Sequence, residues 1–132
     1  MSNVSLFYDY VDINGVNIVK AWLDQLEPKA RAKLITRLNA LEQMNRLDWK
    51  MPMTEVLKGD KDSLIAVRAK SQGVQYRLLG YDGPNRGEFT LLAWCTEQNN
   101  RYVPLDIGRT AFERKTAVDA NPITRRVRHD FR

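Results

Sequence analysis

Two arginines, Arg68 and Arg77, lie opposite each other in the expected pairing of two strands. The runs that contain them are joined by Gln72-Gly73, and a two-residue turn with glycine at positive φ sets Arg68 against Arg77. Like charges placed directly across a strand pair repel and weaken the sheet. The pairing is tolerable when an anion lies between the arginines, either a protein carboxylate or the phosphate of a ligand. The sequence therefore predicts an anion-binding site at this pair.

Alternation along three consecutive runs divides the expected sheet into two faces. An apolar face suits packing against helices, whereas a face of cations, hydroxyls and aromatics suits a half-wet binding surface. The apolar face is predicted to carry Ile65, Val67, Ala69, Val74, Tyr76, Leu78, Phe89, Leu91 and Ala93. The opposite face is predicted to carry Ala66, Arg68, Lys70, Gln75, Arg77, Tyr81, Thr90, Leu92 and Trp94. The simpler alternative is a solvated face whose arginines pair with Glu55, Asp82 or Glu97.

Composition places the chain among small globular proteins. Its 132 residues fit one domain, and 21 Lys and Arg against 16 Asp and Glu favour polyanionic partners. No apolar run approaches the roughly 18 residues of a membrane span, and there is no signal-peptide pattern, so we expect a cytoplasmic protein without membrane contact. Cys95 is expected to be a small core residue on the apolar face. One cysteine and one histidine cannot supply a zinc-type ligand set, so no metal is expected.

The order of the periodic segments predicts an α+β fold. Leu6 to Val11 alternates as a strand, Asn17 begins a helix, and Pro28 begins another. After the three-run meander, Pro104 begins a third helix that ends at Asn121-Pro122. We therefore expect an N-terminal strand and two helices packed on one face of an antiparallel β-meander, with a C-terminal helix. Residues 1–121 are expected to form one domain, and residues 122–132 a basic C-terminal tail.

The second expected helix carries three cations at a spacing of four residues. Lys29, Lys33 and Arg37 lie on the side opposite its apolar positions. Charge on an amphipathic helix normally faces water, so this stripe is interpreted as a solvated face.

Several short motifs follow one another in a distinctive order. They are Leu57-Lys58-Gly59 before the meander, Arg68 in its first strand, Tyr76-Arg77 in its second, Phe89-Thr90-Leu91-Leu92 in its third, the Pro104-led helix with Ala111 and Arg114, and the closing His129-Asp130-Phe131. Taken together, over roughly residues 7 to 131, these motifs resemble the RelE/HigB superfamily of toxin-antitoxin systems, and more narrowly its phage-derived, HigB-like branch.

The resemblance implies a RelE-like fold and a small RNA-cutting toxin. Such toxins are neutralised by a cognate antitoxin, for which we expect a helix-turn-helix protein, and usually cut mRNA on the ribosome. They use no metal or cofactor, because the RNA 2′-hydroxyl attacks its own 3′-phosphate and leaves a 2′,3′-cyclic phosphate. The protein orients the nucleotide, stabilises negative charge and moves two protons.

The resemblance also assigns roles to residues of this chain. Arg68 matches the strand arginine that family toxins direct at the scissile phosphate, and Arg77 matches the arginine of the tyrosine-arginine pair. Lys58 matches the basic residue before the glycine, a position suited to phosphate contact. Lys70, on the same face as Arg68, is expected to bind RNA as well.

The end of the third run departs from the family pattern. Many members carry two lysines where this chain has Glu97 and Gln98, and Arg101 is the candidate replacement. Glu97 is then either a general base or the partner that neutralises the arginines. His129 is the other candidate proton carrier, because an imidazole titrates near neutral pH.

This departure leaves other functions open. One is a non-catalytic binding protein on the same fold that recognises a partner protein or operator DNA. The other is a gyrase inhibitor, as in the related ParE branch.

Overall fold

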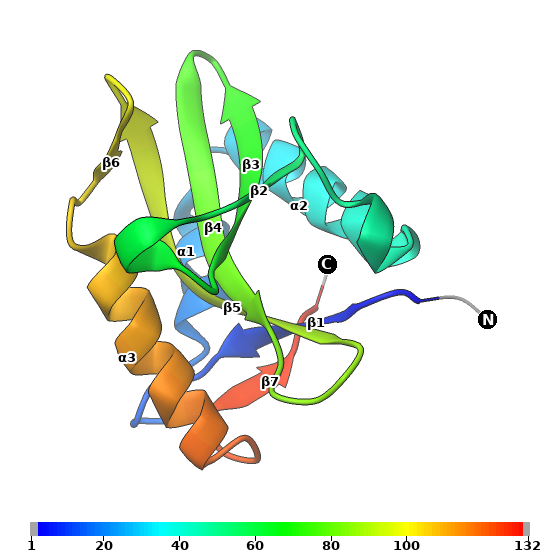
Figure 1. Ribbon diagram of the computed structural model, residues 1–132. Coiled ribbons are helices and arrows are strands. Elements are labelled where there is room, and N and C mark those ends of the chain that lie inside the picture. Colours follow the sequence, from blue (N-terminus) through cyan, green and yellow to red (C-terminus); the bar gives the residue numbers. More distant parts are fainter. Residues whose placement is uncertain (1–2, 131–132) are drawn as a thin grey trace.

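A seven-stranded mixed β-sheet organises the chain, with β2, β3, β4, β5, β1 and β7 side by side in that order and β6 paired with β5 (Figure 1). The computed structural model describes residues 3–130. The strands are β1 (Leu6–Tyr10), β2 (Thr54–Val56), β3 (Ile65–Ser71), β4 (Val74–Asp82), β5 (Glu88–Gln98), β6 (Arg101–Val103) and β7 (Arg126–Arg128). The helices are α1 (Ile18–Gln25), α2 (Pro28–Gln43) and α3 (Ile107–Ala120), with short 3₁₀ turns η1 (Arg46–Asp48) and η2 (Gly59–Lys61). The α+β class is therefore confirmed.

Helices α1 and α2 begin where the sequence predicts, whereas α3 begins at Ile107 and not at Pro104. Asn17 caps α1 by accepting a hydrogen bond from the Lys20 N–H at 2.9 Å. Pro28 occupies the first turn of α2, and the Glu27 side chain accepts from the Ala30 N–H at 2.8 Å. Within residues 3–130 no helix is long and apolar enough to cross a membrane.

The β3–β4–β5 meander is antiparallel, and its first hairpin has the predicted register. Gln72 and Gly73 have φ values of 51° and 83°, as a two-residue hairpin turn requires, and Arg68 is paired with Arg77. The first strand joins this meander at β5, to which β1 runs parallel from Leu6 opposite Glu88 to Asp9 opposite Leu91.

A β-bulge in β5 corrects the predicted faces of the third strand. Leu79 is paired with Ala93 but Gly80 with Leu91, so Leu92 is an extra residue on β5. Because cross-strand partners share a face, Ala93 and Cys95 lie on the face of Leu79 and Arg77, and Trp94 lies on the face of Leu78. The prediction that put Ala93 and Cys95 on the apolar face and Trp94 beside the arginines was wrong.

The early helices cover the face that carries Leu78 and Trp94. The Trp22 ring of α1 is stacked on Trp94 with centroids 5.3 Å apart, and Trp49 Nε1 donates to the Leu41 carbonyl at the end of α2. Figure 1 shows α1 and α2 behind the sheet and α3 on its near side. The other face, which carries the arginines, is therefore partly covered by α3 and η2 rather than fully open.

The C-terminal segment belongs to the sheet, contrary to the prediction of a basic tail. β7 pairs antiparallel with β1, placing Arg128 opposite Tyr8, and the His129 N–H donates to the Phe7 carbonyl at 2.9 Å. These contacts join residues more than a hundred positions apart, and no local pattern in the sequence signals them. Phe131 and Arg132 lie outside the described residues.

Candidate functional site

Arg68 and Arg77 both line one small hollow on the face of the sheet opposite α1. Its volume is about 180 Å³, and it is lined by Arg37, Pro52, Arg68, Ala69, Lys70, Gln75 and Arg77. No described residue that lines this hollow carries a carboxylate. Four cations therefore converge on a space of the size of a small anion.

Arg77 is held firmly by the protein. Its Nε donates to Glu97 Oε1 at 2.9 Å, its Nη2 to Gln75 Oε1 at 2.7 Å and its Nη1 to the Tyr76 carbonyl at 2.9 Å. The residue is only 2% exposed. Glu97 is thus the counterion of Arg77, as one of the two predictions for Glu97 stated, but between residues 3 and 130 it forms no ion pair with Arg68. Asp82, the second acid considered as a partner, instead pairs with Arg46 at 2.8 Å.

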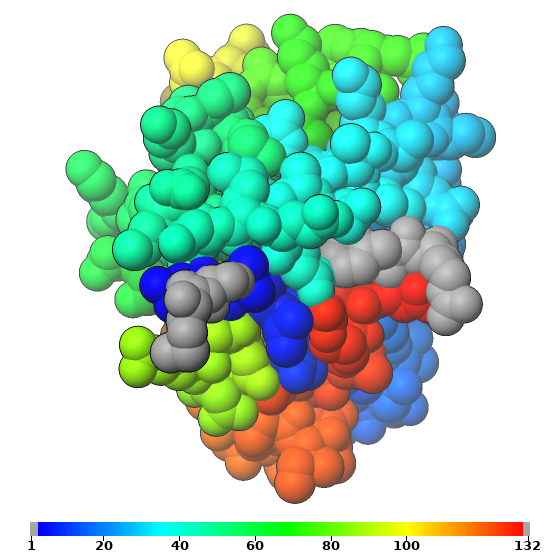
Figure 2. Space-filling view, turned by 90° about the vertical axis from the view of Figure 1, so that its right-hand side faces the viewer, coloured from blue at the N-terminus to red at the C-terminus, as the bar shows by residue number. Residues whose placement is uncertain are grey.

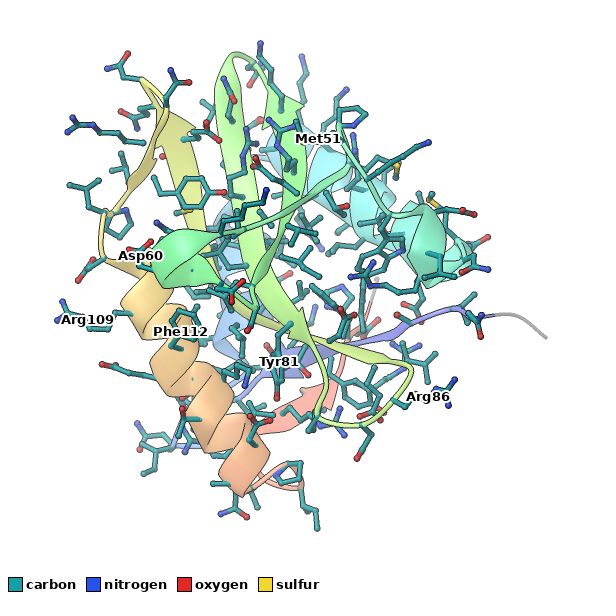
Figure 3. All side chains as sticks on the ribbon, in the orientation of Figure 1. Met51, Asp60, Tyr81, Arg86, Arg109 and Phe112 are labelled. Atoms are coloured by element: carbon teal, nitrogen blue, oxygen red, sulfur yellow. The ribbon has the colours of Figure 1, made fainter. Side chains whose placement is uncertain are left out.

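Arg68 is held differently, because its contacts leave its charge without a carboxylate. Nη1 lies 3.0 Å from Met51 Sδ and 3.4 Å from the Pro52 carbonyl, both in the loop before β2. Figure 3 shows Met51 beside the upper part of β3. Between residues 3 and 130 Arg68 forms no ion pair, and its Nε is buried without a hydrogen-bond partner. A buried donor of this kind favours an anion that can accept a hydrogen bond from it.

Arg37 of α2 also belongs to this site. Its position in the basic stripe of the helix had predicted a solvated side chain. Burial, and then the positive charge of Arg68, lower the pKa of Arg37 below its ordinary value. Its Nη1 is buried and has no hydrogen-bond partner among the described residues. Arg37 and Arg68 therefore form the like-charged pair of the site, whereas Arg77 is already neutralised. The available sequence signal was the regular spacing of Lys29, Lys33 and Arg37.

A second basic hollow lies across the sheet, and it brings together Lys58 and Arg101. Its volume is about 360 Å³, and its lining comprises Leu57, Lys58, Lys61, Asn100, Arg101, Tyr102 and Leu105. Lys61 Nζ lies 5.5 Å from the centre of the Tyr102 ring. Burial, followed by nearby negative charges of which Glu55 is the largest, raises the pKa of Tyr102 to about 12. Lys61 and Tyr102 were not predicted as site residues.

One row of residues links the two hollows. Lys70 is paired with Gln75, Gln75 with Glu97, and Glu97 with Tyr102, so the four share one face of β3, β4, β5 and β6. Three strand spacings of about 4.8 Å separate the ends of this row. A ligand with several negative charges can therefore contact both hollows at once.

His129 is not part of this site. Its Nδ1 lies 2.7 Å from Asp9 Oδ1, and the two side chains are 1% and 0% exposed. It follows β7, which is separated from β3 by β4, β5 and β1. The structure thus brings together Arg68, Arg77, Glu97 and Lys70, and Lys58 with Arg101, but places His129 at the other end of the sheet. Within residues 3–130 no group of three or more His, Cys, Asp or Glu side chains is arranged to hold a metal ion.

The chain matches a known protein family. The model of a family described as phage derived protein Gp49-like (DUF891) matches residues 21–95. This range extends from α1 to Cys95 and includes Arg37, Lys58, Arg68 and Arg77. No curated protein and no solved structure matches the chain.

Proposed function

The chain belongs to the phage-derived Gp49-like family, and from this membership we propose that it is the toxin of a type II toxin-antitoxin system that acts as an mRNA endoribonuclease. The family is associated with toxin-antitoxin toxins of the RelE-like kind. The proposed fold is RelE-like, and the proposed branch of the family is the HigB-like one. The proposed cleavage of mRNA needs no metal and inhibits translation.

The observation that carries the proposal is the hollow that Arg37, Arg68 and Lys70 line without a carboxylate. A phosphodiester in cleavage passes through a phosphorane with increased negative charge, and prearranged cations in a partly dehydrated site stabilise that charge strongly. Arg37 Nη1 and Arg68 Nε are two buried donors whose hydrogen bonds no described residue accepts. Guanidinium groups suit this task because they are always charged and present a planar fork of donors.

The proposed reaction is a transesterification within the RNA. The 2′-oxygen forms a bond to the adjacent phosphorus, the bond from phosphorus to the 5′-oxygen breaks, and the products are a 2′,3′-cyclic phosphate and a 5′-hydroxyl. One proton leaves the 2′-hydroxyl and one reaches the leaving oxygen. Arg68 and Arg37 stabilise the phosphorane, and Glu97, held by Arg77, is the proposed proton carrier. Arg77 is a positioning residue, because its hydrogen bonds orient Glu97 and Gln75.

The remaining cations are proposed to bind RNA beside the scissile phosphate. Lys70 borders the hollow, and Lys58 and Arg101 line the second hollow with Tyr102. Aromatic rings beside cations suit single-stranded RNA, because bases stack on the ring while phosphates contact the cations. A cognate antitoxin, expected to be a helix-turn-helix protein, is proposed to neutralise the toxin.

Induction of the protein without its neighbouring gene tests the proposal. We expect growth arrest and new mRNA 5′ ends in primer extension, both lost in Arg68→Ala and Arg37→Ala. Arg109→Ala is the control, because Arg109 is exposed and its guanidinium pairs with Asp106 just before the start of its own helix. Absence of new ends with the wild-type protein would reject the nuclease, and full toxicity of Arg68→Ala would reject the assignment of that residue.

One observation favours a second candidate, a non-catalytic binding protein on the same fold. Glu97 neutralises one of the two facing arginines, which reduces the positive charge available to a transition state. If the protein has that function, we expect the purified protein to bind an acidic partner or a nucleic acid tightly and to leave ribosome-bound mRNA intact.

A further inference from the structure

The outer side of α2 and the β3–β4 hairpin enclose a groove that continues the arginine hollow. Its volume is about 790 Å³, and it is lined by Lys29, Ala32, Lys33, Thr36, Arg37, Ala40, Met53, Lys70, Ser71 and Gln72. Arg37 and Lys70 line both this groove and the hollow at Arg68. Figure 2 shows the exposed side of α2 with the tip of the hairpin beside it.

Two parallel rows of residues give the groove its character. Lys29, Lys33 and Arg37 form one row, four residues apart, and the small residues Ala32, Thr36 and Ala40 form the other. A rise of about 1.5 Å per helical residue places successive cations about 6 Å apart along the axis, which is comparable to the separation of phosphates along an extended strand. The small residues leave room for that strand to approach the helix.

Lys29 and Lys33 are exposed, as predicted for a solvated face, and Arg37 is half-buried. All three line a groove, and no described residue of its lining carries a carboxylate. The row also ends at Arg37, whose Nη1 is buried without a partner among the described residues. The groove thus leads from solvent to the site where we place the scissile phosphate.

We propose that this groove binds the backbone of single-stranded RNA flanking the cleavage site, with Lys29, Lys33 and Arg37 each contacting one successive phosphate. The proposal rests on the proposed function for the position of the scissile phosphate. A single strand fits better than a duplex, because the three cations form one row along one helix and so match one phosphate backbone. Helix α2 then determines the length of RNA that the protein needs for full binding.

The test measures binding separately from cleavage. A 2′-O-methyl octanucleotide has no nucleophile and cannot be cut, so fluorescence anisotropy at several salt concentrations reports binding alone. Each phosphate contact to a single strand contributes about 0.7 to the slope of log affinity against log salt, so Lys29→Gln/Lys33→Gln should reduce that slope by roughly 1.4. At 0.1 M salt the octanucleotide should bind about tenfold or more weakly. A trinucleotide, too short to occupy the whole row, should lose much less affinity.

The matched control is Arg86→Gln/Arg109→Gln, which removes the same charge. Figure 3 shows both side chains pointing away from the protein, and neither lines the groove. An equal loss of slope in both double variants, or an unchanged slope in the lysine variant, would overturn the proposal. A poly-glutamate peptide that binds more tightly than the octanucleotide, with the same dependence on the lysines, would also overturn it in favour of an acidic protein segment.

Failure of the proposed function gives a different result. If the wild-type protein binds the octanucleotide through the two lysines but yields no new mRNA ends in cells, the groove stands and the nuclease is rejected. If it cuts mRNA but the lysine variant binds and cuts as the wild type does, the nuclease stands and the groove is rejected.

Discussion

Arg77 Nε donates a hydrogen bond to Glu97 Oε1 at 2.9 Å, and this pair joins the middle of β4 to the end of β5. The Arg77 side chain is 3% exposed and that of Glu97 is 21% exposed. A buried guanidinium requires a counterion, because an isolated charge in a medium of low dielectric constant is very unfavourable. Glu97 therefore has a structural role, because it neutralises the buried charge of Arg77.

Replacing Glu97 by alanine should destabilise the protein by roughly 2–4 kcal/mol, because it leaves the buried charge of Arg77 without its partner. Urea unfolding of the variant measures this loss. The double variant Arg77→Met/Glu97→Leu should recover much of it, because no unpaired charge then remains. A single variant as stable as the wild type would show that the pair contributes little to stability.

Replacing Arg37 by methionine should separate stability from function. Burial and the charge of Arg68 both disfavour the charged form of Arg37, which is why its pKa is lowered. Removing the like charge should therefore leave the free energy of unfolding unchanged or raise it by up to about 1 kcal/mol, as is common for residues at functional sites. RNA binding should weaken at the same time. A variant that is both less stable and equally active would contradict this role for Arg37.

Local sequence signals predicted the register of the central hairpin and the starts of α1 and α2. Gln72-Gly73 defines a two-residue turn, and this alone places Arg68 opposite Arg77. Asn17 and Pro28 mark helix starts because capping and the fixed φ of proline act on adjacent residues. These features depend on contacts within a few positions of the chain, so the sequence is sufficient to infer them.

The bulge at Leu92 could not be inferred in this way. Phe89, Thr90, Leu91, Leu92 and Ala93 are all fully buried, and four of the five are apolar, so the alternation of the run does not reveal an extra residue. The convergence of Arg37 on Arg68 likewise depends on how α2 packs against the sheet. The second hollow could not be predicted from the sequence either, because Lys61 and Tyr102 meet only when η2 lies beside β6.

Cys95 should be unreactive in the folded protein and should affect stability at high pH. Burial raises the pKa of its thiol to about 12 from an ordinary value near 9. Burial makes the thiolate of Cys95 less favourable in the folded protein than in the unfolded chain. The contribution of the protonated thiol to the free energy of unfolding is therefore complete below the unfolded pKa near 9, and it should be lost as pH rises from about 9 towards 12. Iodoacetamide at pH 8 should label the native protein much more slowly than the protein in urea.

The control for this pH dependence is Cys95→Ala, which lacks the thiol and should lose less stability over the same range. Equal declines in the variant and the wild type would assign the effect to other groups. Rapid labelling of the native protein would show that the thiol is accessible, contrary to its 4% exposure.

His129 should be a determinant of stability rather than of catalysis. Its Nδ1 lies 2.7 Å from Asp9 Oδ1, and Asp9 Oδ2 also accepts a hydrogen bond from Asn17 Nδ2 at 2.9 Å. The pair thus connects the C-terminal segment, β1 and the cap of α1. His129→Ala removes one partner of a buried hydrogen-bonded pair and should cost roughly 2–4 kcal/mol, measured by urea unfolding. RNA cleavage per folded molecule, measured at a temperature where the variant remains folded, should stay within about twofold of the wild type. A stable variant that has lost cleavage would restore His129 as a candidate proton carrier.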